Sequence, residues 1–172
     1  SVMDAHGLAF SNTYTLEQIY GLRTVVRGAG FLLNNEMGDF NPRPGHTDRV
    51  GRIGTKANLI APGKRMLSSQ CPTVVTRDGR PQLITGSPGG RTIINTVLCV
   101  VLNALEFGMD LPAAIDAPRV HHSWLPDVAF LERRSGMPTD ETLNDLQKLG
   151  HNLITGGIQG NAHSILVEDE RY

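Results

Sequence analysis

The sequence has only two cysteines in 172 residues, Cys71 and Cys99. Two cysteines are too few for a disulfide framework, although they leave a single bridge open. Long apolar runs are missing too. The longest candidate, residues 96–105, is interrupted by Asn103 and falls short of the roughly 20 residues that span a bilayer. We therefore expect neither a disulfide-rich scaffold nor a transmembrane segment in this chain.

An excess of charge of one sign is also absent. The 16 Lys and Arg residues nearly balance the 17 Asp and Glu residues, and the formal net charge is −1. Because no basic stripe is available to attract phosphate groups, nucleic acid is not an expected partner. The first residues lack the basic leader and apolar core of a signal peptide, so we expect any export signal to lie outside the chain.

Glycine and proline, in contrast, are abundant, with 19 and 10 residues. This composition favours many turns and short strands over a helical bundle. The apolar content of 40% is sufficient for one core, and the length favours one domain.

Turn signals and alternation predict a set of short strands. The clearest is a hairpin in which Asp78-Gly79 forms the turn, because this dipeptide suits two residues with positive φ. Extended pieces joined by a bend are expected within residues 23–33. The predicted strands cover residues 8–16, 73–76, 82–85, 128–131, 153–155 and 164–167.

Helical spacing of apolar residues predicts helices over residues 91–107 and 138–149. A shorter helix begins after Asp110 and ends before Pro118, because the residue before proline resists helical backbone angles. Residues 34–45 are predicted as loop. Residues 41–64 are predicted as a long irregular surface excursion of the kind that often borders a site, and the alternative is a disordered linker. Strands paired in sequence with helices at intervals indicate a layered α/β or α+β sandwich rather than a parallel βαβ array.

A glycine turn is the first candidate for chemistry. Gly89-Gly90 lies between a predicted strand and a predicted helix, so its N–H groups can point at an anion or a developing oxyanion. The alternative is a plain packing turn. The spacing is not that of a Walker motif, and no Lys follows to hold a phosphate.

Two further pairs carry side chains suited to an amino acid. Glu36 and Asp39 lie in a non-periodic segment without neighbouring Lys or Arg, and such a pair suits an ammonium group. The alternatives are a solvated acidic loop and a local turn network of asparagine and aspartate side chains. Ser68 and Ser69 precede a predicted strand and could hold a carboxylate, although paired serines are more often turn formers.

The adjacent histidines His121 and His122 invite a metal interpretation. Neighbouring residues on a strand face opposite ways, however, and no third ligand is close in sequence. We interpret both as structural, and we expect neither a metal ion nor another cofactor.

Taken together, four segments resemble the small subunit of gamma-glutamyltransferases in order and spacing, and the resemblance covers nearly all 172 residues: LLNNEMGDF, KRMLSSQCPT, LITGSPGG and APRVHHSWLPD. The resemblance implies a four-layer αββα N-terminal-nucleophile amidohydrolase sandwich, of which residues 1–172 supply the small-subunit half. It also implies autocleavage of a precursor, a large-subunit partner, and glutathione or another γ-glutamyl compound as substrate. The family's habit is a periplasmic or extracellular location.

The resemblance assigns roles residue by residue. Glu36 and Asp39 match the positions that hold the substrate α-amino group, and Ser68 and Ser69 match those that bind its α-carboxylate. The oxyanion hole falls on Gly89 and Gly90. Thr15 matches the threonine that hydrogen-bonds the nucleophile. Glu17 falls where many members of the family have an Asn that contacts the amino group.

Two departures from the family qualify these roles. Glu17 would bring a third carboxylate to Glu36 and Asp39, which puts strict γ-glutamyl specificity in doubt. The family's small subunit opens with Thr-Thr-His and an aromatic residue before a Ser-Val pair, whereas this sequence begins at Ser1-Val2. We expect the nucleophilic Thr to precede Ser1 and a few residues to follow Tyr172.

The sequence thus predicts covalent acyl transfer from a γ-glutamyl amide to water or an amino acid. One alternative is a related acylase of the same fold that acts on a different acyl group, which Glu17 keeps open. The other is a non-catalytic domain that keeps the amino-acid pocket, prompted by the missing Thr.

Overall fold

The computed structural model describes residues 1–41, 43–46 and 54–168. These residues form two compact units. Unit 1 contains Ser1–Thr13 and the chain from Ser69 onward, and unit 2 contains Tyr14–Ser68. Length alone favours a single core. Among the described residues, every buried apolar side chain except Phe40 lies in unit 1, so unit 1 holds the main core.

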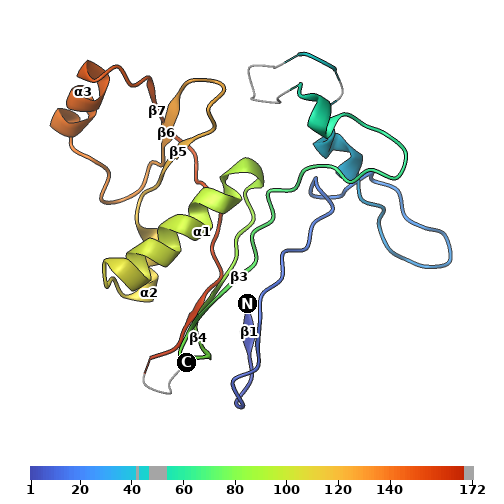
Figure 1. Ribbon diagram of the computed structural model, residues 1–172, viewed down its shortest axis with the longest axis horizontal. Helices are drawn as coiled ribbons and strands as arrows, with labels where there is room; N and C mark the ends of the chain where they lie inside the picture. Colours follow the sequence, from blue (N-terminus) through green and yellow to red (C-terminus); the bar gives the residue numbers. More distant parts are fainter. Residues whose placement is uncertain (42, 47–53, 169–172) are drawn as a thin grey trace. The chain divides into compact units, whose positions relative to one another are not determined.

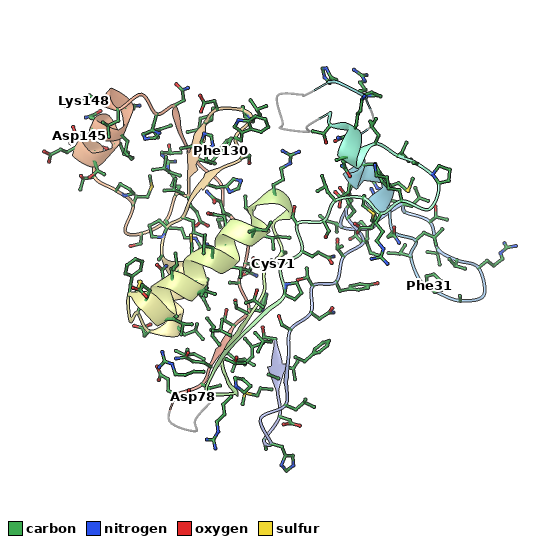
Figure 2. The ribbon with its side chains drawn as sticks, in the orientation of Figure 1. Phe31, Cys71, Asp78, Phe130, Asp145 and Lys148 are labelled. Atoms are coloured by element: carbon green, nitrogen blue, oxygen red, sulfur yellow. The ribbon has the colours of Figure 1, made fainter. Side chains whose placement is uncertain are left out.

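The central feature of unit 1 is an antiparallel sheet in the order β3-β4-β8. Strands β3 (Thr73–Arg77) and β4 (Arg80–Thr85) form the predicted hairpin, and β8 (Ile165–Leu166) pairs with β4. Asp78 and Gly79 have φ of 52° and 77°, which are the positive values that a two-residue hairpin turn needs. In Figure 1 the red segment of β8 lies along β4, and Figure 2 shows Asp78 at the tip of the hairpin. The hairpin prediction is confirmed.

Helices cover this sheet and bury its apolar side chains. Helix α1 (Ile93–Val101) follows the 3₁₀ turn η3 (Gly90–Thr92) and continues into the π-helical turn η4 (Leu102–Glu106). Helix α2 (Leu111–Asp116) lies beside α1 in Figure 1. Leu83 of β4, Ala104 of η4 and Ala114 of α2 form the centre of the core. The helices predicted at 91–107 and after Asp110 are confirmed, and Asp110 caps α2 by accepting from the Ala113 N–H at 2.8 Å.

A second, mixed sheet in unit 1 has the order β5-β6-β7. Strand β5 (Val120–His122) pairs antiparallel with β6 (Ala129–Leu131), and β6 pairs parallel with β7 (Leu153–Thr155). Helix α3 (Asp140–Lys148) lies between β6 and β7 in sequence, and Thr139 caps it by accepting from the Thr142 N–H at 3.3 Å. The predictions for residues 128–131, 138–149, 153–155 and 164–167 are confirmed within a few residues at each end.

The strand predicted at residues 8–16 is wrong for most of its length. Strand β2 (Ala9–Phe10) pairs with β1 (Val2–Met3) and ends there. Beyond Phe10, the Ser11 hydroxyl donates to the Thr85 carbonyl at 2.8 Å and accepts from the Thr73 N–H at 3.2 Å. A side chain therefore makes the bonds that a longer strand would have made with its backbone.

Unit 2 has little regular structure. An isolated antiparallel bridge joins Val25 and Leu32, which confirms two extended pieces around a bend. The loop predicted at 34–45 is wrong for the 3₁₀ turn η1 (Glu36–Asp39), where the Asn34 side chain accepts from the Glu36 N–H at 3.1 Å and starts the turn. A second 3₁₀ turn, η2 (Lys56–Asn58), interrupts the irregular excursion. Part of that predicted excursion, residues 42 and 47–53, lies outside the described residues.

The described elements establish an α+β fold with antiparallel and mixed sheets. In the part of the chain that the structure describes, both cysteines are unpaired and no helix is long and apolar enough to cross a membrane.

Candidate functional site

The predicted site residues fall into two groups, one in each unit. Thr15, Glu17, Glu36, Asp39 and Ser68 belong to unit 2. Ser69, Gly89 and Gly90 belong to unit 1, so the boundary separates the two serines. The single pocket that the sequence predicts from both groups stays a prediction.

In unit 2, the turn η1 carries Glu36 and Asp39 at its two ends. Both side chains are half-buried. One carboxylate oxygen of Glu36, Oε1, is buried and has no hydrogen-bond partner among the described residues. A buried polar atom without a partner is rare in folded proteins and calls for an explanation. A bound ligand that donates a hydrogen bond to Glu36 Oε1 would explain this atom.

The pKa of Glu36 is raised above its ordinary value. Burial is the largest cause, followed by the negative charges of Asp39 and Glu17. A hydrogen bond from the Thr15 side chain acts in the opposite direction and lowers the pKa. Among the residues that the structure describes, no cationic side chain contributes to this pKa shift. The negative charges of Asp39 and Glu17 act together on Glu36, so this cluster of carboxylates in unit 2 suits a cation.

Thr15 joins Glu17 to Glu36. Its Oγ1 accepts from the Glu17 N–H at 2.7 Å, and its side chain also hydrogen-bonds Glu36. Glu17 itself has φ of 72°, a left-handed conformation that is uncommon for a residue other than glycine. A Cβ atom on Gly38 would lie 3.6 Å from Glu17 Oε1, so the Glu17 carboxylate lies against η1. The crowding of three carboxylates that the sequence predicts is confirmed within unit 2.

Asn58 connects η1 to the segment before Ser68, and sequence reasoning missed it. The Asn58 side chain donates to the Asp39 carbonyl at 2.7 Å and accepts from the Leu67 N–H at 2.9 Å. Asn58 is buried. Its two bonds hold the predicted ammonium and carboxylate positions of unit 2 at a set separation. A single sequence gives no signal for this, because Asn58 lies in an irregular segment with no motif.

In unit 1, the glycine turn sits between β4 and α1 as predicted. Gly89 has φ of 140° and Gly90 has φ of 56°, values that favour glycine over other residues. Within the described part of the chain, neither N–H group of the turn donates to a protein acceptor. Two exposed N–H groups at a helix start can stabilise negative charge. Ser69 is half-buried and precedes β3.

The two histidines lie on β5 and make separate contacts. His121 Nε2 is 2.7 Å from Ser123 Oγ, and His122 Nε2 is 3.1 Å from Asp127 Oδ1. Burial is the largest cause that lowers the pKa of His121, followed by the charges of His122 and Arg91. These contacts are local to one strand and its following turn, and the structural role of both histidines stays a prediction.

Comparison with known proteins decides the family. The family model for gamma-glutamyltranspeptidase matches residues 1–172. This chain belongs to that family. Among its relatives is a glutathione hydrolase proenzyme from Escherichia coli (strain K12), 43% identical over 167 residues that cover 97% of this chain. The chain spans 28% of that relative's length.

Solved gamma-glutamyltranspeptidase structures share the fold. One, the acivicin-inhibited enzyme, has a TM-score of 0.89 and 42% identity, and the match covers 97% of this chain and 88% of that one. Another, the gamma-glutamyltranspeptidase from Pseudomonas nitroreducens complexed with L-DON, has a TM-score of 0.88 and 41% identity, with 99% and 89% coverage. Membership in the family and the α+β fold are therefore confirmed.

Proposed function

We propose that this chain is the small-subunit part of an enzyme that cleaves γ-glutamyl amides, such as glutathione, and transfers the acyl group to water or an amino acid. The observation that carries the proposal is the buried Oε1 of Glu36 near Asp39, which has no hydrogen-bond partner among the described residues. An amino-acid ammonium would give this oxygen a donor and the cluster a positive charge. Relatives of this family that are named glutathione hydrolases support the proposed substrate class.

The proposed mechanism is nucleophilic catalysis in two steps. A threonine hydroxyl that precedes Ser1 attacks the γ-carbonyl carbon, and the α-amine of the same threonine takes the hydroxyl proton. The N–H groups of Gly89 and Gly90 stabilise the tetrahedral oxyanion. The intermediate expels the amine, which receives the proton, and leaves a γ-glutamyl ester. Water or an amino group then attacks this ester and restores the threonine.

Within this mechanism, a further set of residues binds the donor. Glu36 and Asp39 receive the α-ammonium, and Ser68 with Ser69 holds the α-carboxylate. Thr15 orients the nucleophile. Its hydrogen bond to Glu36 would couple the orientation of the nucleophile to donor binding. Glu17 accepts from the ammonium or sets the charge around it.

A large subunit from the same precursor is the proposed partner. Ile94, Leu98 and Leu102 repeat at every fourth position along α1 and η4 and are exposed. Apolar residues at this spacing form one helix face, which usually packs against another element. The E. coli relative is a proenzyme of which this chain spans only 28%, so the rest of a similar precursor could cover this face. In the proposed assembly the two subunits form the four-layer αββα sandwich.

A related acylase activity is the second candidate, and Glu17 favours it. An added carboxylate beside Glu36 and Asp39 changes the charge that the acyl group meets. The site could then prefer an acyl group other than γ-glutamyl.

The glycine turn offers a direct test of the proposed chemistry. In the full-length protein, Gly90→Pro removes one N–H donor and should lower the rate of γ-glutamyl anilide cleavage about a hundredfold or more. Because φ of 56° at Gly90 also opposes proline, Gly28→Pro is the matched control. Gly28 has φ of 83° and open space around it. Equal rates for Gly90→Pro and Gly28→Pro would refute the oxyanion role.

A further inference from the structure

Residues 159–161, near the end of the chain, pack against the glycine turn. Gly160 has φ of 74°, and its backbone lies against the turn residues. A Cβ atom on Gly89 would lie 3.1 Å from Gly160 Cα. A Cβ atom on Gly160 would lie 2.5 Å from Ser87 Oγ and 2.9 Å from the Pro88 carbonyl oxygen. Only a residue without a side chain fits between the segment and the turn.

Hydrogen bonds hold the residues next to Gly160 on both sides. The Asn161 N–H donates to Ser87 Oγ at 2.9 Å, and that hydroxyl donates to the Pro88 carbonyl at 2.6 Å. Ser87 is buried. Ser87, two positions before Gly89, is thus hydrogen-bonded to the residue after Gly160.

Gln159, on the other side, is anchored in a buried polar network. Its N–H donates to Glu132 Oε1 at 2.8 Å. Its carbonyl accepts from Thr96 Oγ1 at 3.1 Å and from Arg119 Nη1 at 3.2 Å. Thr96 lies on α1, the helix that the glycine turn starts. Arg119 and Glu132 are 2% and 0% exposed, so water cannot replace these bonds easily.

We propose that Gly160 is a positioning residue for the oxyanion-stabilising N–H groups of Gly89 and Gly90. This inference rests on the proposed function. The buried network holds the backbone of Gln159 in place, and Gln159 in turn holds the neighbouring Gly160. The backbone of Gly160 then limits how far Gly89 can move toward it. Preorganised donors gain their catalytic effect from fixed placement, and a displacement of about 1 Å can lower a rate about a hundredfold.

The test compares two alanine substitutions in the full-length protein. Gly160→Ala and Gly157→Ala both place a side chain at positive φ, since Gly157 has φ of 64°. Gly157 has no atom within 4 Å of a new Cβ, whereas Gly160 is enclosed. We expect Gly160→Ala to lower kcat about 10- to 100-fold with little change in KM, and Gly157→Ala to keep kcat near the wild-type value.

A double variant tests the route of the effect. Ser87→Ala removes the nearest atom to the new Cβ, and it also removes the acceptor of the Asn161 N–H. We expect Ser87→Ala to lower kcat by itself, and Gly160→Ala with Ser87→Ala to lose less than the product of the two single losses. A multiplicative loss would contradict positioning through this contact.

The outcomes separate this inference from the proposed function. The wild-type rate on a γ-glutamyl anilide tests the proposed function. The ratio of the kcat of Gly160→Ala to the kcat of the wild-type protein tests the inference. This ratio can be measured on any amide that the wild-type protein cleaves. Equal kcat values for the Gly160→Ala and Gly157→Ala variants would overturn it. If Gly160→Ala does not fold, Ser87→Ala decides, and an unchanged kcat in that variant would overturn the inference.

Discussion

The side-chain amide of Asn58 donates a hydrogen bond of 2.7 Å to the backbone carbonyl of Asp39. The same side chain accepts from the Leu67 N–H at 2.9 Å, directly before Ser68. One buried side chain therefore links the two parts of unit 2 to which we assign the ammonium and the carboxylate of the donor. An amino acid presents these two groups at a set distance, so the link bears on specificity.

Loss of the Asn58 link should weaken donor binding. Asn58→Ala removes two hydrogen bonds, each of which contributes about 0.5–1.5 kcal/mol. We expect KM for a γ-glutamyl anilide to rise about tenfold with a smaller change in kcat. Asn152→Ala is the control, because Asn152 also donates to a distant carbonyl, that of Asp127, which is not a candidate site residue. Steady-state kinetics would refute the link if both variants kept the wild-type KM.

The raised pKa of Glu36 predicts how donor binding depends on pH. An ammonium binds the ionised carboxylate, and burial with the charges of Asp39 and Glu17 favours the protonated form. KM for the donor should therefore fall as the pH rises through the raised pKa of Glu36. Glu36→Gln removes the titrating group and should flatten this part of the profile. The same pH dependence in the Glu36→Gln protein would assign it to another group.

The same pKa shift has a consequence for folding, with a definite sign. The pKa of Glu36 is higher in the folded chain than its ordinary value, so its contribution to stability is fully present at acidic pH. This contribution is lost as the pH rises through the folded-state pKa. In the absence of donor, Glu36→Gln should therefore gain stability relative to wild type on going from acidic to neutral pH, as measured by urea unfolding. A stability difference that does not change with pH would contradict the shift.

Neutralising Glu17 should move the pH profile. Glu17 is one of the charges that raise the pKa of Glu36. Glu17→Gln removes this charge, so the fall in KM should occur at lower pH than in the wild-type protein. Glu106→Gln is the control, because Glu106 lies on η4 and is not among the described groups that shift the pKa of Glu36. A profile for Glu17→Gln that overlays the wild type would show that the two carboxylates do not interact.

Breaking the buried ion pair between Arg119 and Glu132 should lower the free energy of unfolding much more than breaking an exposed pair. Arg119 Nη1 lies 3.0 Å from Glu132 Oε2, and both side chains are almost fully buried. Glu132→Ala leaves the guanidinium uncompensated and should lower the free energy of unfolding by about 3–5 kcal/mol. Asp145 and Lys148 form an exposed pair at 2.9 Å on α3 (Figure 2). Asp145→Ala should cost only about 0.2–1 kcal/mol. Equal costs in denaturant unfolding would contradict the importance of the network.

Local signals allowed much of unit 1 to be predicted from the sequence. Asp78-Gly79 predicted the hairpin because its turn chemistry is local, and Asp110 predicted the start of α2 because capping involves only neighbouring residues. The strand predicted beyond Phe10 failed because a tertiary bond from Ser11 to Thr85 replaced backbone pairing. Non-local contacts of this kind leave no pattern in a short stretch of sequence.

The candidate site shows the same division. The sequence predicts Glu36 and Asp39 as a pair, since two carboxylates without a flanking Lys or Arg stand out in a sequence. Asn58 and Gly160 were not predicted, because each acts through residues far away in the chain. Gly160 lies 71 positions from Gly89, and only the fold shows that the two backbones meet.

The most direct test of the account compares a γ-glutamyl anilide with the corresponding glutaryl anilide, using kcat/KM of the full-length protein. The two substrates differ only in the ammonium that Glu36 and Asp39 are proposed to bind. Each charge-assisted hydrogen bond contributes about 1.5–3 kcal/mol, so the wild-type protein should prefer the γ-glutamyl substrate at least about tenfold. The preference should shrink in Glu36→Gln. Equal rates on the two substrates, or a preference for the glutaryl substrate, would contradict the account and favour the acylase alternative.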